Sequence, residues 1–261
     1  MTRRIIKANP KIAWVGFFTL ISLMLSMTLK GYGNMDAIAK DKEEEKFLQL
    51  RAAMVKNQIA DPPDYREPVT DRNIISAMLS VPRHKFVRPG QVSRAYGDYL
   101  LPIGYGQTIS QPYIVALMTE LLDIKPTHKV LEVGTGSGYQ AAILSCLVKK
   151  VFTVEIVEPL GRQAAGRLKE LSYDNVQVKF ADGYYGWKEN APYDRIIVTC
   201  AATLIPPPLL KQLRPGGKMC IPVGSQYAVQ YLTMVERSEK GEIRMKKELP
   251  VRFVPLTRQL R

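Results

Sequence analysis

Short apolar runs and helically spaced apolar residues alternate along the middle of this chain. A run of about four to eight apolar residues bounded by turn residues is typical of a buried strand, whereas apolar residues three and four apart are typical of a helix. The first predicted strand begins at Val130. The others cover 151–155, 176–180, 194–202 and part of 213–224. The predicted helices cover 112–122, 139–147, 159–171 and 206–213. This alternation predicts an α/β fold with a doubly wound, mainly parallel sheet.

The two ends of this pattern differ from its middle. Before it, the apolar residues follow a helical period from Phe47, and a second helix is predicted over 71–79. After it, apolar residues at 227–236 and 246–253 flank a polar turn and predict an antiparallel pair of strands. We therefore expect one domain made of a helical layer and an α/β core with C-terminal strands. The expected bounds are 40–261 for the domain, 40–100 for the layer and 101–261 for the core.

A separate N-terminal segment precedes this domain, within residues 1–39. Four basic side chains come before residues 12–29, which are uncharged, mostly apolar and just long enough to cross a bilayer as a helix. The segment is longer than the apolar part of a usual signal peptide, although Ala37-Ile38-Ala39 resembles a cleavage site. We expect a retained membrane-type helix, with a cleaved signal as the alternative. The distribution of basic residues weakly favours an exported domain.

Composition and charge narrow the possible chemistry. An apolar content of 46% and a charged content of 23% are those of a globular protein. The three cysteines are scattered without metal-ligand spacing, and we interpret them as buried thiols. Two histidines in unrelated contexts disfavour a histidine metal centre or catalytic triad, so no metal is expected. The net charge is +13, and five of the basic residues lie within 1–35, so the remainder is moderately basic.

A glycine-rich turn follows the first predicted strand of the core. The run VLEVGTGSGY spaces its glycines G-x-G-x-G, and it contains no Lys or Arg to meet a phosphate. The dinucleotide-binding motif instead has G-x-G-x-x-G and holds a pyrophosphate. The run therefore favours S-adenosylmethionine, with Glu132 holding the amino group of the cofactor. The residues of the turn predicted to bind it are Gly134, Thr135, Gly136 and Gly138.

Acidic residues end the next two predicted strands. Glu155 lies 21 positions after Gly134, close to the spacing at which a carboxylate accepts the ribose hydroxyls of a nucleotide. Asp182 and Gly183 follow the third strand, where a carboxylate can reach the adenine amino group. An Asp-Gly turn without any binding role remains the alternative for this pair.

Several separate motifs make residues 48–256 resemble the protein-L-isoaspartate (D-aspartate) O-methyltransferases. Besides the glycine turn, they include VPRHKFV (81–87), GQTISQP (106–112), ADGYYGW (181–187), LRPGGKMCIPVG (213–224) and VRFVPL (251–256). The resemblance implies the class I S-adenosylmethionine-dependent methyltransferase fold. It implies methyl transfer to the α-carboxylate of L-isoaspartyl and D-aspartyl residues in damaged proteins, followed by collapse of the ester to a succinimide. The family is generally cytosolic, so the resemblance implies a cytoplasmic enzyme, which we expect to be membrane-associated through its N-terminal segment; export to the periplasm is the alternative.

The resemblance also assigns a substrate loop. The serine of the family's loop matches Ser110, and Thr108 offers a second hydroxyl; both are our expected catalytic residues. A carboxylate with a pKa near 4 is already a nucleophile at neutral pH, so no general base is needed. Ser110 is also expected to cap the helix that begins at Pro112. The residues expected to contact the substrate are Ile109, Gln111, Arg252 and Phe253.

Partners and alternatives follow from the same features. We expect isoaspartyl proteins and peptides as substrates, membrane contact through 12–29 if that segment is retained, and a monomer. The run DPPDY (61–65) resembles a base-modifying motif but lies far from the fourth strand, so no nucleic acid is expected. A methyltransferase with a different acceptor, or a membrane-tethered protein of this fold without activity, remains the alternative.

Overall fold

The structure is a computed structural model that describes residues 41–258. Residues from Leu50 onward form one compact unit, and the described residues up to Gln49 belong to a second unit. The backbone is α-helical over 41–54. No helix within the described range is both long and apolar enough to cross a membrane. The predicted membrane-type helix over 12–29 lies outside the described residues, and so does the predicted boundary at residue 39.

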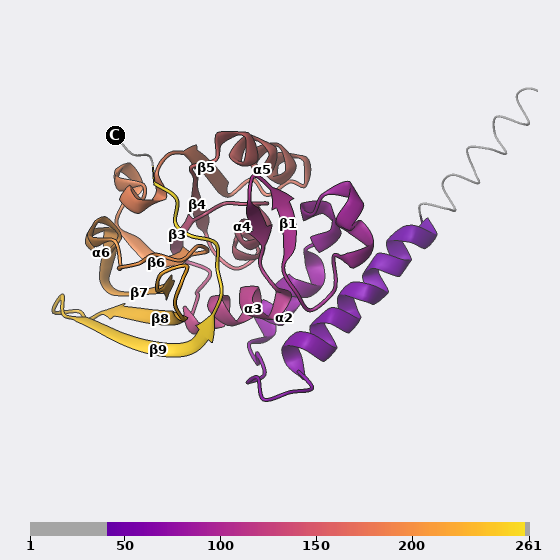
Figure 1. Ribbon diagram of the computed structural model, residues 1–261, viewed down its shortest axis with the longest axis horizontal. Coiled ribbons are helices and arrows are strands. Elements are labelled where there is room, and N and C mark those ends of the chain that lie inside the picture. The colour runs from indigo at the N-terminus through magenta and orange to yellow at the C-terminus, as the bar shows by residue number, and fades with distance from the viewer. Residues whose placement is uncertain (1–40, 259–261) are drawn as a thin grey trace, which may run out of the picture. The chain divides into compact units, whose positions relative to one another are not determined.

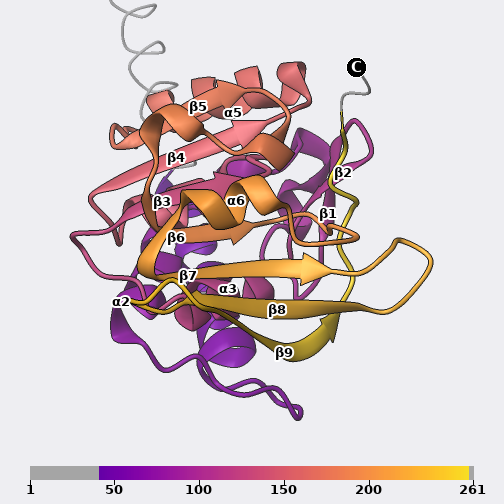
Figure 2. The ribbon, with the colours of Figure 1, turned by 90° about the vertical axis from the view of Figure 1, so that its left-hand side faces the viewer.

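The larger unit is built around a seven-stranded sheet, taking the described residues alone (Figures 1 and 2). Its strand order is β5-β4-β3-β6-β7-β8-β9. The first four pairings in this order are parallel and the last two are antiparallel. The strands of this sheet are β3 Lys129–Val133, β4 Lys150–Glu155, β5 Val176–Phe180, β6 Tyr193–Val198, β7 Leu213–Val223, β8 Gln230–Arg237 and β9 Ile243–Val251.

Helices cover both faces of the sheet. In Figure 2, α6 lies in front of the strands, whereas α2 and α3 lie behind them. Contacts link α2 to both α3 and α4, so the helices before the sheet in sequence join the layer on its rear face. The α-helices are α2 Arg72–Ser80, α3 Pro112–Leu121, α4 Tyr139–Ser145, α5 Glu158–Glu170 and α6 Pro207–Gln212. The short helical segments are η1 Val55–Ala60, η2 Arg83–Phe86, η3 Pro89–Arg94, η4 Gly183–Tyr185 and η5 Lys188–Asn190.

Alternation along the central strands separates two environments. Leu131 and Val133 of β3 pack into the apolar core beneath α6, together with residues of β4, β6 and β7. Glu132, between them, points to the opposite face because successive side chains of a strand alternate. It lies beside Thr153 of β4 in the register of the parallel pair. The sheet is therefore apolar on the α6 face and carries a small polar group on the other.

The predicted doubly wound, mainly parallel sheet and its antiparallel end are confirmed, with small changes at the ends of elements. The largest change is the fourth strand of the core, which ends at Val198 instead of Ala202. The following Ala201 and Ala202 form only isolated bridges, to Pro255 and Val223. They leave the strand because the C-terminal segment and the end of β7 bind their backbone groups.

Residues predicted as a loop form part of a β-hairpin. Strand β1 (Leu101–Gly104) pairs antiparallel with β2 (Gln107–Ile109). The tight turn has positive φ at Gly104, Tyr105 and Gly106. Only Ser110 and Gln111 remain as connection to α3, which begins at Pro112. The polar run therefore presents its residues from a paired strand, and a second hairpin strand limits how far they can move.

One prediction about the cysteines is wrong. Cys200 and Cys220 are buried, as expected, but Cys146 is exposed because it lies just after the last turn of α4. Burial raises the pKa of the Cys200 and Cys220 thiols. The run DPPDY connects η1 to α2 as an irregular loop, in agreement with its interpretation.

Candidate cofactor and substrate site

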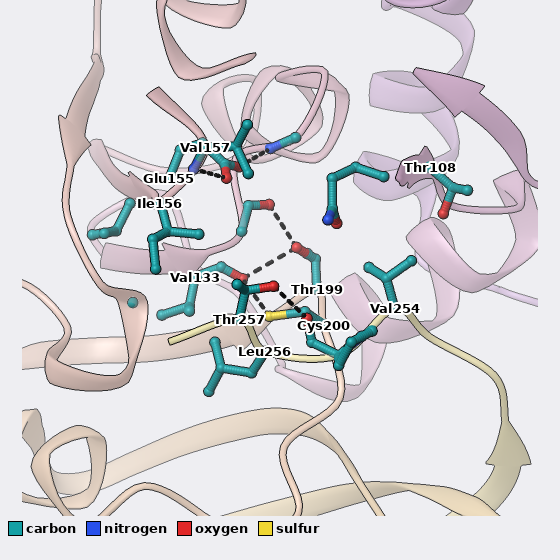
Figure 3. A pocket seen from close by; sticks show the side chains of 16 residues that line it. Thr108, Val133, Glu155, Ile156, Val157, Thr199, Cys200, Val254, Leu256 and Thr257 are labelled. Atoms are coloured by element: carbon teal, nitrogen blue, oxygen red, sulfur yellow. Dashed lines mark hydrogen bonds between the residues drawn. The ribbon is translucent and has the colours of Figure 1, made fainter. Parts of the chain in front are cut away.

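The carboxyl ends of the central parallel strands line one pocket, shown in Figure 3. Ligands of open α/β sheets bind at this edge, where the chain connects strand to helix. The predicted residues that the pocket brings together are Thr108, Gly134, Gly136, Glu155 and Gly183. The remaining lining residues are Gln107 of β2, residues at or just after the ends of β3, β4 and β6, and 254–257. Residues predicted from four separate motifs therefore meet in space.

The glycine turn is held against two strands by its backbone. Gly134 has a φ of 98°, and a Cβ there would lie 2.5 Å from the Thr199 hydroxyl oxygen, so only glycine fits. The Thr199 hydroxyl donates to the carbonyl of Gly134 at 2.6 Å, and the amide of Gly134 donates to the carbonyl of Val154 at 2.9 Å. The turn is therefore a fixed backbone surface rather than a mobile loop.

Two other predicted residues of the turn do not face this pocket. Gly138 is the N-cap of α4, with a φ of 88°, and packs on Leu168 of α5. Thr135 is buried, and its hydroxyl lies 2.7 Å from the hydroxyl of Thr153. Both residues therefore support the turn from below, and their predicted contact with the cofactor remains a prediction.

Glu155 is fixed at the tip of β4 by backbone amides. One carboxylate oxygen accepts from the amide of Gly136 at 2.8 Å, and the other accepts from the amide of Val157 at 2.9 Å. Each carboxylate oxygen can accept a second hydrogen bond. The buried side chain therefore joins the glycine turn to β4 and keeps acceptor capacity for a pair of ribose hydroxyls.

Glu132 is fully buried, and neither of its carboxylate oxygens has a hydrogen-bond partner among the described residues. It lines a small inner cavity beneath the glycine turn, together with Ser110 and Thr108. Burial raises the pKa of Glu132 to about 8; the nearby Thr153 hydroxyl lowers it in part, and the charge of Glu155 raises it further. A buried carboxylate without a partner is costly, so a cationic ligand group would be stabilised here.

These features fit the methionine end and the ribose of S-adenosylmethionine. The orphaned carboxylate of Glu132 matches the cofactor's ammonium group, and the glycine backbone is open for close approach. Glu155 matches the ribose. Nothing in the pocket offers a cationic cradle for a pyrophosphate, because the lining residues include no Lys or Arg.

Asp182 precedes the lining residue Gly183 but does not itself line the pocket, and the C-terminal segment contacts it. One of its oxygens accepts from the amide of Tyr184, and the other accepts from Nε of Arg258 at 2.9 Å. The guanidinium of Arg258 stacks on the Tyr184 ring, with its carbon 3.6 Å from the ring centroid. The predicted adenine-binding carboxylate is therefore shared with an arginine that the sequence did not indicate.

A second, open pocket of about 560 Å³ lies beside the end of the hairpin. It is lined by Thr108, Ser110, Gln111, Arg252 and Phe253, all of them predicted site residues, and by residues of 98–100, Ile114, Pro250 and Val251. Thr108 also lines the cofactor pocket. The hairpin exit is therefore the wall at which a methyl donor on one side and an acceptor on the other would meet.

One expectation for this loop is wrong, and one stays a prediction. Ser110 does not cap α3, because Gln111 occupies the N-cap position and makes no side-chain cap bond. The side-chain amide nitrogen of Gln111 donates instead to the carboxylate of Asp98, at 2.8 Å. Ile109 is buried and lines the small inner cavity but not the open pocket, so its predicted contact with the substrate remains a prediction.

The sequence analysis did not predict several residues of the site. Thr199 follows β6 and clamps the glycine turn, and the rule that strand ends share one edge could have indicated it. Gln230 of β8 binds both backbone groups of Phe253, at 2.6 Å and 3.2 Å. It fixes the segment 252–257 over the pocket, and no local pattern marks a residue with that role.

The histidines serve as structural groups. Nδ1 of His84 lies 2.7 Å from the Tyr96 hydroxyl, and Nδ1 of His128 accepts from the amide of Lys125 at 3.0 Å. Within 41–258, no group of three or more histidine, cysteine or acidic side chains could hold a metal ion.

Comparisons with known proteins agree with this geometry. A family model described as Protein-L-isoaspartate(D-aspartate) O-methyltransferase matches residues 56–261. The Protein-L-isoaspartate O-methyltransferase 2 of Polaromonas sp. is 58% identical over 193 residues, which are 74% of this chain and 92% of that protein.

Two solved structures match most of this chain. A protein-L-isoaspartate O-methyltransferase superposes with a TM-score of 0.66 at 29% identity, covering 71% of this chain and 61% of that one. A Plasmodium falciparum protein described as a beta-aspartate methyltransferase, in complex with S-adenosyl-L-homocysteine, gives a TM-score of 0.67 at 26% identity. That match covers 79% of this chain and 98% of the other. With the family model and the close relatives, these matches show that the chain belongs to the protein-L-isoaspartate(D-aspartate) O-methyltransferase family.

Proposed function

We propose that this chain is a protein-repair enzyme that methylates the α-carboxylate of L-isoaspartyl and D-aspartyl residues with S-adenosyl-L-methionine. The observation that carries the proposal is the position of Thr108 and Ser110. They line the open pocket, and Thr108 also lines the pocket at the strand ends. Membership of the family supports the choice of acceptor.

The residues proposed to hold the cofactor are Glu132, Gly134, Gly136, Glu155, Asp182 and Gly183. When bound, S-adenosylmethionine supplies an electrophilic methyl group on a positively charged sulfur. A carboxylate oxygen of the acceptor forms the new bond to the methyl carbon, and the electrons of the broken carbon–sulfur bond stay on sulfur. The products are a methyl ester and S-adenosylhomocysteine, and no proton has to be moved.

The chain's own contribution is positioning and exclusion of water. The hydroxyls of Ser110 and Thr108 can each donate to the acceptor carboxylate, which orients it without neutralising it. The half-buried setting of Ser110 strengthens such a bond relative to water. Arg252, which is exposed beside the open pocket, and Phe253 are proposed to contact the flanking peptide.

A methyl-transfer assay tests this function. With labelled S-adenosylmethionine, the full chain should place base-labile label on an isoaspartyl peptide and none on its normal aspartyl twin. Ser110→Ala should lose about 10- to 100-fold in turnover, because a hydrogen bond to a charged group contributes about 1.5–3 kcal/mol. Its affinity for S-adenosylhomocysteine, measured by calorimetry, should be unchanged.

The results against the proposal are specific. Equal labelling of both peptides would mean that the acceptor is different. Cofactor binding without transfer to either peptide would favour another substrate, and no cofactor binding would favour a fold without activity. Full turnover in Ser110→Ala would remove that serine from the proposed machinery.

We also propose that residues 12–29 retain the enzyme at a membrane. The motivation is their length and lack of charge after four basic side chains. The full chain should sediment with membranes after an alkaline wash, whereas residues 40–261 should not. Recovery of the full chain in the supernatant would contradict the anchor and would agree with the cytosolic location of the family. A protease-protection experiment then shows which side of the membrane the domain occupies.

A further inference from the structure

Arg83 is fully buried beneath the hairpin exit, although the mechanism above does not use it. It lies in η2, within the motif VPRHKFV, and its side chain has 0% of its surface exposed. Arginine is rarely buried so completely unless it is paired. Its contacts therefore indicate what the residue does.

The guanidinium of Arg83 joins three segments of the site. Its Nε donates to the carbonyl of Ala95 at 2.8 Å, and its Nη2 donates to the carbonyl of Ser110 at 2.7 Å. Its central carbon lies 4.8 Å from the ring centroid of Tyr139, the first residue of α4 after the glycine turn. One side chain therefore connects the substrate wall to the helix that follows the cofactor turn.

The positive charge of Arg83 has no acidic partner. Among residues 41–258, no carboxylate forms an ion pair with it, and its Nη1 has no hydrogen-bond acceptor. Burial lowers the pKa of the guanidinium, and the hydroxyl groups of Tyr139 and Tyr96 raise it in part. Among the described residues, no anionic group neutralises this charge, although the guanidinium has two hydrogen bonds to backbone carbonyls and a contact with the Tyr139 ring.

Arg195 provides a comparison within the same molecule. It is also buried and also donates to backbone carbonyls, those of Leu122 and Asp123. Unlike Arg83, it has a carboxylate within reach, since Asp123 lies 3.6 Å away. It stands near the start of β6, whereas the site lies at the strand ends. The missing acidic partner therefore distinguishes Arg83 from Arg195, which lies away from the site.

We propose that Arg83 is a positioning residue for the acceptor carboxylate, acting through the main chain of Ser110. It fixes Ser110 on the wall of the open pocket and provides a positive potential beneath the place where the acceptor's negative charge arrives. The bound carboxylate thereby supplies the missing anion. This inference rests on the proposed function.

Kinetics of two matched variants test it. Arg83→Met removes the charge and the hydrogen bonds but keeps a long apolar side chain. It should raise the KM for an isoaspartyl peptide by about tenfold or more, with the Kd of S-adenosylhomocysteine within about twofold of the parent. Arg195→Met, the control, should lower the melting temperature without changing kcat/KM. Arg83→Lys keeps the charge but not the two hydrogen bonds of the guanidinium. Its KM should therefore be close to that of the parent, whereas its kcat should be lower than that of the parent.

Each other outcome overturns the inference. Parental kcat/KM in folded Arg83→Met would show that neither charge nor hydrogen bond matters. Equal losses of kcat in Arg83→Met and Arg83→Lys, with the parental KM, would reduce the residue to a structural role. If Arg83→Met does not fold, the KM of Arg83→Lys tests the inference instead. A tenfold increase in that KM would contradict a role for the positive charge in binding the acceptor. Failure of the unmodified chain to methylate the peptide instead rejects the proposed function.

Discussion

The buried carboxyl group of Glu132 makes both stability and cofactor binding depend on pH. Burial raises its pKa to about 8, whereas an unfolded chain has a glutamate pKa near 4.3. Between these values the folded protein binds one more proton than the unfolded chain. The stability of the free protein therefore falls as pH rises from about 4.5 to 8, by up to about 1.4 kcal/mol per pH unit. A cationic ligand group has the opposite preference, because it needs the ionised carboxylate.

Replacing Glu132 by Gln should separate these two effects. The variant should melt at a higher temperature than the parent at pH 8, since it no longer carries a buried charge. It should also bind S-adenosylhomocysteine more weakly, and the rise in affinity between pH 6 and 8 should disappear. Thermal melts and calorimetry across that range measure both. A variant that is less stable and binds normally would show that Glu132 serves the fold and not the ligand.

Single residues could be predicted only where a local pattern places them. The distance from the glycine turn to Glu155 depends on nearby sequence, whereas Thr108 and Ser110 were assigned through the resemblance of their loop to the family. Arg258 and Arg83 act across 76 and 27 residues of chain, on Asp182 and Ser110. Contacts between residues so far apart in the sequence depend on how whole elements pack, so no rule about sequence spacing predicts them.

At the scale of elements, the hairpin of β1 and β2 sets the geometry between the two pockets. Its turn needs φ of 71° at Gly106, a region in which other residues are strained. A side chain at Gly106 would meet no heavy atom within 4 Å, so only the backbone strain matters. The turn therefore offers a way to weaken the hairpin without disturbing any contact.

Gly106→Ala should destabilise the hairpin by about 1 kcal/mol through this strain. The expected result is a higher KM for the peptide with little change in the Kd of S-adenosylhomocysteine. Gly90→Ala is the matched control, because Gly90 is equally open but has no positive φ, and it should leave both constants unchanged. Equal effects of the two substitutions would argue against a role for the hairpin turn.

The hairpin is also the element that the sequence described least well. A run rich in Gly, Thr, Ser and Pro is typical of a loop, and β2 has only three residues. Its partner strand contains Pro102, and their pairing is irregular between Pro102 and Gly104. The mainly apolar runs of β3 and β4 predicted strands more clearly, because strands buried on both faces of a parallel sheet have mainly apolar sequences.

At the scale of the whole molecule, one C-terminal segment borders both pockets. Residues 250–253 line the open pocket, and residues 254–257 line the pocket at the strand ends. The backbone of Val254 and Leu256 is bound to Ala201, so the segment crosses the strand ends as a paired element. Parallel strands gather their carboxyl ends at one edge, which made the first pocket predictable. The return of the last segment across that edge involves residues far apart in sequence, so Arg252 and Phe253 were expected near the substrate but the crossing of 254–257 over the cofactor pocket was not predicted.

A wall shared by two pockets links their affinities. By reciprocity, any factor by which spent cofactor tightens peptide binding must equal the factor by which peptide tightens retention of spent cofactor. We expect that factor to exceed one, and calorimetric titrations run in both orders would measure it. Two independent affinities would contradict the linkage. A damaged protein would then delay clearance of S-adenosylhomocysteine, so that product inhibition grows with the amount of damage. The pace of repair would depend on how quickly the cell removes the spent cofactor.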